Sequence, residues 1–359
     1  MAEGSGALNL FRPALTATKL SLIYLPSKET IKTKGQWLLL CLRLLLMVFL
    51  GLPSWCQLGV QVLSFDWNRG IHDAEGTVLI VRDVTLGQCY NGIVFALWWQ
   101  YTGKIAELIK MLDDADTSGV LFGQAKKGQS IFGYAVVGFG SIGAHIFCGI
   151  FQWIFDENVP KSANNVLFEI VFPGVCFIWA LCAWMVVVWQ YTLCLTACNL
   201  LFLDYNKRFS SAEPQFRQSH LAEFFFEHAT LCDIVEHLNR MFEGYVLWQL
   251  CFGVPFFIFQ CYFLLSAFSQ MSWALVVQSC ASVLIGTYAS LALIVTAATL
   301  NAEIDKPRSV MYKERSLWTP YNSQRYELLN AFSLKLSGPA IGISMWGVVQ
   351  ITKSFLFTV

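Results

Sequence analysis

Residues Trp273–Leu300 read WALVVQSCASVLIGTYASLALIVTAATL and contain no charged side chain. A helix needs roughly 20 predominantly apolar residues to cross the hydrocarbon core of a bilayer, so this stretch is long enough to span a membrane. Six further stretches have the same character, at Trp37–Leu63, Val78–Tyr101, Ile131–Trp153, Val166–Leu203, Tyr245–Ala267 and Ile341–Val359. The sequence therefore predicts an all-α polytopic membrane protein with seven transmembrane helices.

The composition supports this fold class. Hydrophobic residues make up 56% of the 359 residues, and charged residues make up 13%, compared with about 25% in typical soluble domains. The mean hydropathy is +0.53. The chain has too little polar surface to cover a water-soluble globule of this length, so a soluble protein is strongly disfavoured.

Positive charge is distributed unequally between the two sets of loops. Nineteen of the 24 Lys and Arg residues lie in the N-terminal segment 1–36 and after the second, fourth and sixth spans, whereas only Arg69 and Lys161 lie in the opposite loops. Because cytoplasmic loops carry the excess of Lys and Arg, the N-terminal segment is expected inside and the C-terminus outside. Residues 37–359 then form the seven-span domain. The first apolar run has the features of a signal anchor, which indicates a multi-pass plasma-membrane protein.

The cysteines indicate neither a disulfide framework nor a metal site. Eleven of the twelve fall inside apolar stretches, and Cys232 lies on the predicted cytoplasmic side. Cys194 and Cys198 are spaced i, i+4, but no second Cys or His pair accompanies them, so packing is favoured over metal binding. The sequence also lacks a Gly-rich phosphate loop, a His-Glu-x-x-His motif and a Gly-x-Ser-x-Gly motif. No metal, no cofactor and no enzymatic activity are expected.

The cytoplasmic connections are predicted to be helical. Ala106–Asp113, His220–Phe242 and Ser323–Leu336 carry apolar residues at helical spacing, and the second of these leads without a break into the fifth span. Pro307 and Pro320 interrupt the helix between the sixth span and Ser323–Leu336. The fourth span is too long for a bilayer of about 30 Å unless it also projects inward. Such a cytoplasmic bundle either packs on its own chain or provides contacts between subunits.

Two segments carry a resemblance to a known family. The pattern HATLCDIVEHLNRMFE at His228–Glu243, which enters an aromatic fifth span, resembles the corresponding segment of the insect-type gustatory receptors. The segment ELLNAFSLKL at Glu327–Leu336 is also similar, and a Gly-rich approach and a last span beginning at Ile351 follow it. The order and spacing of these segments, seven spans and an inside N-terminus all match the superfamily of gustatory and odorant receptors.

The resemblance implies a function. The family consists of chemosensory receptors that are themselves ligand-gated, cation-permeable channels, assembled as tetramers through the cytoplasmic helices and the last span. It implies a small-molecule tastant as ligand and places Thr352, Phe355 and Leu356 on the pore-lining span. The family's Thr-Tyr, five residues, Gln-Phe signature does not occur before Val359. This difference favours a sequence that is truncated within the last span.

Candidate ligand-binding residues are aromatic or polar side chains in the outer half of the spans, where an external molecule arrives. Polar groups at depth are the stronger candidates because such residues tend to face the bundle or a wet cavity. Packing against neighbouring helices is the competing explanation for each aromatic residue, and a core hydrogen bond is the competing explanation for His145. The candidates are His145, Phe151, Phe172, Trp179, Phe256, Gln260, Tyr262 and Gln278.

Two other classes of membrane protein remain as alternatives. A serpentine receptor coupled to a G protein also has seven spans, but its N-terminus would lie outside, against the observed distribution of positive charge. A small-molecule transporter is expected to show an internal repeat or charged residues near the bilayer midplane, and the sequence shows no such repeat. The resemblance implies a homo- or hetero-tetramer surrounded by membrane lipids, and no feature of the sequence indicates nucleic acid.

Overall fold

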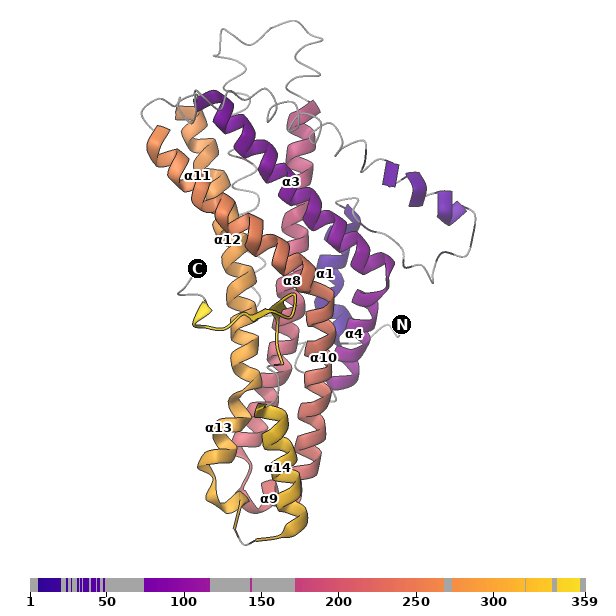
Figure 1. Cartoon of the computed structure of the whole chain (residues 1–359). Coiled ribbons are helices and arrows are strands. Elements are labelled where there is room, and N and C mark those ends of the chain that lie inside the picture. Colours follow the sequence, from indigo (N-terminus) through magenta and orange to yellow (C-terminus); the bar gives the residue numbers. More distant parts are fainter. Residues whose placement is uncertain are drawn as a thin grey trace, which may run out of the picture.

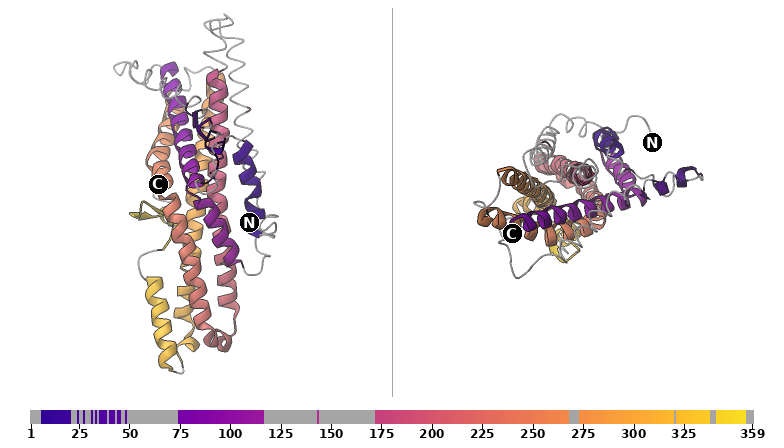
Figure 2. Two further views of the ribbon diagram at one scale, coloured as in Figure 1. Left: turned by 90° about the vertical axis from the view of Figure 1, so that its right-hand side faces the viewer. Right: turned by 90° about the horizontal axis from the view of Figure 1, so that it is seen from above.

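The computed structural model shows an elongated bundle of long helices (Figure 1 and Figure 2). The structure describes residues 6–20, 24, 27, 31, 33, 35–38, 40–42, 44–45, 48, 74–116, 143, 172–267, 273–319, 321–337 and 341–355. The predicted third span, at residues 131–153, lies outside the described residues except for Gly143, and so does most of the first span. The all-helical polytopic fold class is confirmed.

Four long helices form the centre of the bundle. They are α3 (Ala74–Tyr101), α8 (Phe172–Ser211), α10 (Leu221–Trp248) and α12 (Trp273–Ile304). A π-helical turn, η3 (Gln249–Gly253), connects α10 to α11 (Val254–Ala267), so one continuous rod runs from 221 to 267. Within the described residues, three helices are long and apolar enough to cross a membrane: Ile178–Ser211, Leu221–Ser266 and Ser279–Lys313.

The long helices extend beyond the membrane at one end. Helix α8 has 40 residues and is therefore about 60 Å long, twice the thickness of a hydrocarbon core. Its charged residues begin only at Asp204, and α12 carries none before Glu303. The cytoplasmic bundle consists of these charged ends, the first part of α10, and four short elements: α9 (Pro214–Ser219), α13 (Lys306–Lys313), η5 (Arg315–Leu317) and α14 (Ser323–Ser337). It occupies the lower end of Figure 1.

An aromatic core and buried polar contacts hold the cytoplasmic bundle together. The core is centred on His228, whose ring lies 5.3 Å from that of Phe332 in α14 and 5.8 Å from that of Phe202 in α8. The His228 Nε2–H donates to the carbonyl of Ile304 at 3.3 Å. Burial is the main cause that lowers the pKa of His228 to about 4, so the ring is neutral at pH 7. The predicted helices at His220–Phe242 and Ser323–Leu336 are confirmed.

Two amphipathic helices pack beside the long ones. Helix α4 (Lys104–Ala115) confirms the helix predicted at Ala106–Asp113, and it buries Ile105, Leu108, Ile109 and Leu112. Helix α1 (Gly6–Leu20) belongs to the predicted N-terminal segment and contacts both α4 and α8. The Ala7 N–H donates to Asp113 Oδ1 at 2.8 Å, and Gln190 of α8 donates to the buried Thr18 hydroxyl. The N-terminal helix is thus part of the packed structure.

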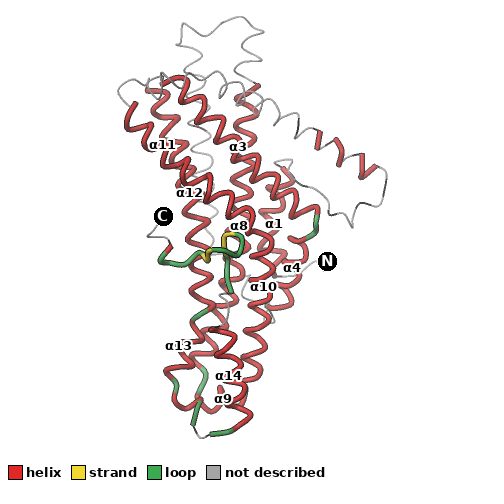
Figure 3. The backbone as a smooth tube through the Cα atoms, viewed as in Figure 1, coloured by secondary structure: helices red, strands yellow, loops and turns green. Residues whose placement is uncertain are grey.

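The predicted helix over Ile341–Val359 is wrong in the part that the structure describes. Residues 341–355 form a β-hairpin with strands β1 (Ser344–Met345) and β2 (Val349–Gln350) followed by a turn (Figure 3). Trp346 and Gly347 have φ values of 47° and 70°. Two consecutive positive φ angles produce the tight turn that joins antiparallel strands and break any helix at this point.

Side chains of the neighbouring helices satisfy the backbone of the hairpin. Asn301 of α12 donates through Nδ2 to the carbonyls of Ile343 and Ile351, at 3.1 and 2.7 Å, and its Oδ1 accepts from the Ile343 N–H at 2.9 Å. Asn239 Oδ1 of α10 accepts from the Ser344 N–H at 2.8 Å. The hairpin is therefore bound to both long helices where they leave the membrane-spanning region.

Candidate functional site

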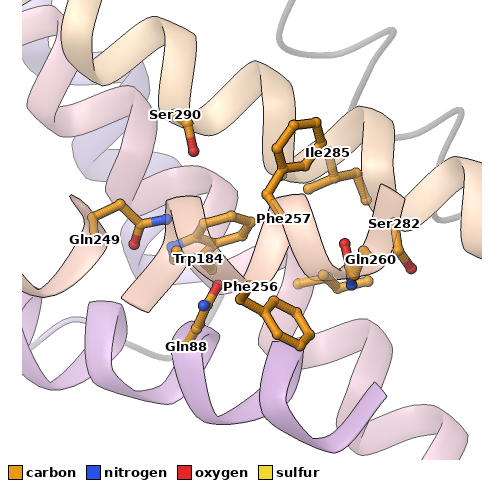
Figure 4. A pocket seen from close by; sticks show the side chains of 12 residues that line it. Gln88, Trp184, Gln249, Phe256, Phe257, Gln260, Ser282, Ile285 and Ser290 are labelled. Atoms are coloured by element: carbon orange, nitrogen blue, oxygen red, sulfur yellow. The ribbon is translucent and has the colours of Figure 1, made fainter. Parts of the chain in front are cut away.

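A cavity of about 20 Å³ lies between helices α3, α8, α11 and α12, beside the π-helical turn (Figure 4). It is located in the apolar half of the bundle, above the charged ends of the helices. Its walls combine apolar rings with amide and hydroxyl groups. The residues around it are Gln88, Leu181, Trp184, Gln249, Gly253, Phe256, Phe257, Gln260, Ser282, Ile285, Gly286 and Ser290.

The π-helical turn positions one side of the cavity. An extra residue in a helical turn widens the backbone, and such turns are frequent at functional sites. Gln249 and Gly253, the first and last residues of η3, both face the cavity. A Cβ atom at Gly253 would lie 3.0 Å from Gln249 Nε2, so glycine leaves the space that the Gln249 amide occupies.

A second glycine, Gly92 of α3, allows close packing of Trp184, which lines the cavity. A Cβ atom at Gly92 would lie 2.6 Å from Cδ1 of Trp184, a distance that real Cβ atoms do not adopt. Only glycine therefore lets the indole of Trp184 approach the backbone of α3. The indole in turn forms a wall between α3 and the residues of α11 (Figure 4).

A cluster of buried aromatic rings packs between the helices on the cytoplasmic side of Gln249. One turn before Gln249, Tyr245 packs with its ring centre 5.6 Å from Trp99, and Phe242 lies 4.6 Å from Trp99 and 4.8 Å from Tyr191. These rings meet edge to face at interplanar angles between 72° and 87°, the arrangement that aromatic rings prefer. All four side chains are fully buried. These four rings join α3, α8 and α10 in one packed layer.

The chemistry of the cavity is polar but uncharged. None of the residues around it is Asp, Glu, Lys, Arg or His, so a charged molecule would lose its hydration without gaining an opposite charge. Among the described residues, no group of three or more His, Cys, Asp and Glu side chains could hold a metal ion. The site can provide hydrogen bonds, ring stacking and exclusion of water.

The structure brings two of the predicted ligand-binding residues together. Phe256 and Gln260, one turn apart on α11, both line the cavity, and Gln260 is 5% exposed. Trp179 does not line it and packs instead against Tyr90 of α3, with 6.1 Å between the ring centres. Tyr262 is 59% exposed and points away from the bundle.

The other predicted site residues are only partly described. Phe172 and Gln278 lie in α8 and α12, but their side chains are outside the described part of the structure, and His145 and Phe151 lie outside it entirely. Of the predicted pore-lining residues, Leu356 is also outside. Thr352 and Phe355 follow the hairpin, and the Phe355 N–H donates to the Thr352 hydroxyl at 3.3 Å.

Sequence reasoning missed several residues around the cavity, most clearly Gln88, Gln249 and Trp184. The signal that could have found the two glutamines is their position inside apolar spans, where a polar side chain tends to face other helices or a wet cavity. The predicted ligand-binding residues all lie in the third to sixth spans, whereas Gln88 lies in the second span and Gln249 in the inner half of the fifth.

The chain is similar to known proteins in both sequence and structure. The family model described as 7tm chemosensory receptor matches residues 21–359. The insect olfactory receptor OR5 from Machilis hrabei has a similar structure, with a TM-score of 0.71, 10% sequence identity, and coverage of 98% of this chain and 94% of that chain. The same receptor in complex with eugenol gives a TM-score of 0.66 at 12% identity, with coverage of 98% and 95%. At this identity the likeness shows the fold alone. Comparison with curated proteins found no match.

Proposed function

The chain belongs to the family of 7tm chemosensory receptors, and we propose that it is a gustatory-type receptor of the plasma membrane, a subunit of a ligand-gated cation channel. As a member of this family it is a membrane receptor and not an enzyme. The proposed ligands are small tastant molecules that bind in the cavity between α3, α8, α11 and α12. The observation that carries the proposal is this uncharged, partly polar cavity inside the membrane-spanning bundle.

The composition of the cavity supports a small-molecule ligand. Ligand sites in proteins are mostly apolar with a few convergent polar groups, and here Trp184, Phe256 and Phe257 surround the amides of Gln88, Gln249 and Gln260. The structurally similar OR5 binds the small molecule eugenol. The volume of about 20 Å³ has room for a single water molecule, so a tastant requires the aromatic walls to move outward. That movement supplies a link between binding and gating.

Exposed apolar side chains support assembly through the cytoplasmic bundle. Tyr312, Tyr321 and Leu334 are 61%, 73% and 70% exposed on α13, the loop before α14, and α14. Large apolar groups that face water cluster at sites of protein contact. We propose that these surfaces meet in a tetramer, and the mass of the purified complex in detergent tests this arrangement.

The hairpin supports a later start of the pore-lining span. The bond from the Phe355 N–H to the Thr352 hydroxyl has the spacing of a helix N-cap, in which a side-chain oxygen accepts from the backbone three residues on. The proposed span therefore begins at Thr352 instead of Ile341. Thr352, Phe355 and Leu356 remain the residues proposed to line the pore.

An electrical recording tests the proposed function. The chain is expressed in cells, G-protein signalling is blocked, and a tastant panel is applied. A ligand-evoked cation current that persists under the block is expected for a receptor that is itself a channel. A current that disappears with the block would instead support the serpentine alternative, and uptake of the ligand without current would support a transporter.

A matched pair of variants tests the cavity in the same recording. Gln260→Ala removes a buried amide that lines the cavity and is expected to shift the dose-response curve by about tenfold, the effect of roughly 1.4 kcal/mol. Gln324→Ala removes an exposed amide of α14 and should leave the curve unchanged. Equal curves for both variants would contradict this location of the ligand. His145→Ala carries the same expectation as Gln260→Ala.

A further inference from the structure

Two buried amides beside the cavity each have a polar atom without a hydrogen-bond partner in the described part of the chain. Gln88 of α3 is 8% exposed and Gln249 of η3 is 2% exposed. Gln88 Nε2, a donor, and Gln249 Oε1, an acceptor, have no hydrogen-bond partner among the residues that the structure describes. Burying an amide without a partner costs free energy, and most buried polar side-chain atoms in proteins are paired. A bound molecule with a donor and an acceptor would supply a partner for both groups.

The two amides are directed to the same place. Figure 4 shows the Gln88 and Gln249 side chains approaching Trp184 from different helices, with their amide ends towards its ring. Two glycines leave room for these side chains. Gly253 leaves space for the Gln249 amide, and Gly92 allows Trp184 to lie against α3. A side chain held in place before a ligand arrives binds it at lower entropic cost.

The size and charge of the space define the group that fits. The cavity of about 20 Å³ is large enough for one group of the size of water. Among the described residues, no charged side chain lines it, so a carboxylate or an ammonium group is disfavoured. A hydroxyl group has the required size, is neutral, and both donates and accepts a hydrogen bond. The apolar part of its molecule would contact Trp184, Phe256 and Phe257.

We propose that Gln88 and Gln249 form a subsite that recognises a hydroxyl group on a neutral, ring-containing ligand. The ligand O–H donates to Gln249 Oε1, and its oxygen accepts from Gln88 Nε2. A molecule that lacks the hydroxyl leaves both amides unpaired, and sites built around such groups discriminate strongly against it. This proposal rests on the proposed function because it assigns a ligand class to the same cavity.

The test compares two probes that differ only in the hydroxyl group. Benzyl alcohol and toluene are added to the purified full chain in detergent, and their dissociation constants are measured against the free aqueous concentration. Benzyl alcohol is expected to bind at least about tenfold more tightly, which corresponds to the usual strength of one to two hydrogen bonds. Equal dissociation constants would overturn the proposal.

Variants of matched length locate the effect. Gln88→Met and Gln249→Met are each expected to weaken benzyl alcohol binding by about tenfold and to leave toluene binding unchanged, whereas Gln324→Met on exposed α14 should change neither. If a Met variant keeps the preference for benzyl alcohol, the substituted glutamine is not part of the subsite. Gly253→Ala provides a second route if a Met variant does not fold, since the new Cβ displaces the Gln249 amide and should reduce the same preference.

The binding test and the electrical recording together distinguish failure of the hydroxyl subsite from failure of the channel function. If benzyl alcohol binds selectively but no molecule of the tastant panel evokes a current, the hydroxyl subsite stands and the channel function is wrong. If a tastant evokes a current through the wild-type chain but the two probes bind equally, the channel stands and the hydroxyl subsite is wrong.

Discussion

Replacing Asn301 with alanine is predicted to release the hairpin at residues 341–351 from helix α12. The substitution removes three hydrogen bonds, of 2.7, 2.9 and 3.1 Å, and leaves the Ile343 N–H and the carbonyls of Ile343 and Ile351 without these partners. Asn301 is 4% exposed, and Ile343 and Ile351 are fully buried. At about 1 kcal/mol for each bond, with an added penalty for buried unpaired groups, docking should weaken by about 2–4 kcal/mol.

Hydrogen exchange of the hairpin amides measures this effect directly. An opening free energy lowered by 2–4 kcal/mol accelerates exchange by roughly 30- to 1,000-fold, and the expected site is the peptide that contains Ile343 and Ser344. Gln350→Ala removes a single bond, to the carbonyl of Ile341, and should produce a smaller acceleration. Gln324→Ala, on exposed α14, should produce none.

An independent variant approaches the same contact from the hairpin. A Cβ atom at Gly342 would lie 2.4 Å from Asn301 Oδ1 and from Gln350 Nε2, so Gly342→Ala should accelerate exchange in the same peptide. Unchanged exchange of residues 341–351 in both Asn301→Ala and Gly342→Ala would refute the conclusion that Asn301 holds the hairpin in place.

Two further predictions concern the cytoplasmic bundle. The folded-state pKa of His228 is about 4, below the unfolded value of about 6.5. Its contribution to stability is therefore complete above pH 6.5 and is lost as the pH falls towards 4, by up to about 3 kcal/mol. His228→Gln should flatten the dependence of the unfolding temperature on pH in this window, and an unaltered slope would contradict burial of a neutral ring. Arg217 is 3% exposed and bonds Glu314 and the carbonyls of Ser210 and Ala212, so Arg217→Met should lower the free energy of unfolding by about 2–4 kcal/mol. Arg240→Met, which breaks an exposed ion pair with Glu236, should lower it by less than about 1 kcal/mol, and similar thermal unfolding curves for the two variants would argue against the bonding of Arg217.

Much of the helical fold could be predicted from the sequence because its signals are local. The stripe of apolar residues in His220–Phe242 depends only on helical spacing, and the structure has a helix there from Leu221 onwards. The same holds for Ser323–Leu336 and α14. Periodicity and charge distribution report directly on which face of a helix is buried and which end leaves the membrane.

The end of the chain could not be predicted in the same way, because its structure depends on distant partners. Ile341–Val359 is apolar enough to indicate a span, but its backbone bonds to Asn301 and Asn239, which are 42 and 105 residues away in the sequence. Gly342 and Gly347 were local signs of an interrupted helix. The prediction of a span rests on the number of apolar residues and does not take these two glycines into account.

The candidate site was predicted in part for a similar reason. Phe256 and Gln260 are polar or aromatic residues on a recognisable span, and the structure places both beside the cavity. Gln249 faces it because the backbone forms a π-helical turn at that point. A regular 3.6-residue repeat, which is the basis of sequence periodicity, does not describe such a turn.

The π-helical turn at Gln249–Gly253 also makes the receptor sensitive to a change in chain length at one point. Each residue of an α-helix advances the chain by about 100° around the axis. Deleting one residue here would restore regular winding and rotate the whole of α11 by that angle relative to α10. Phe256 and Gln260 would turn out of the cavity, while Ile258 and Tyr262, now 57% and 59% exposed, would change their orientation with them. Among related receptors, insertions and deletions should therefore be rarer in this turn than substitutions. A receptor that carries such an insertion or deletion should detect different molecules.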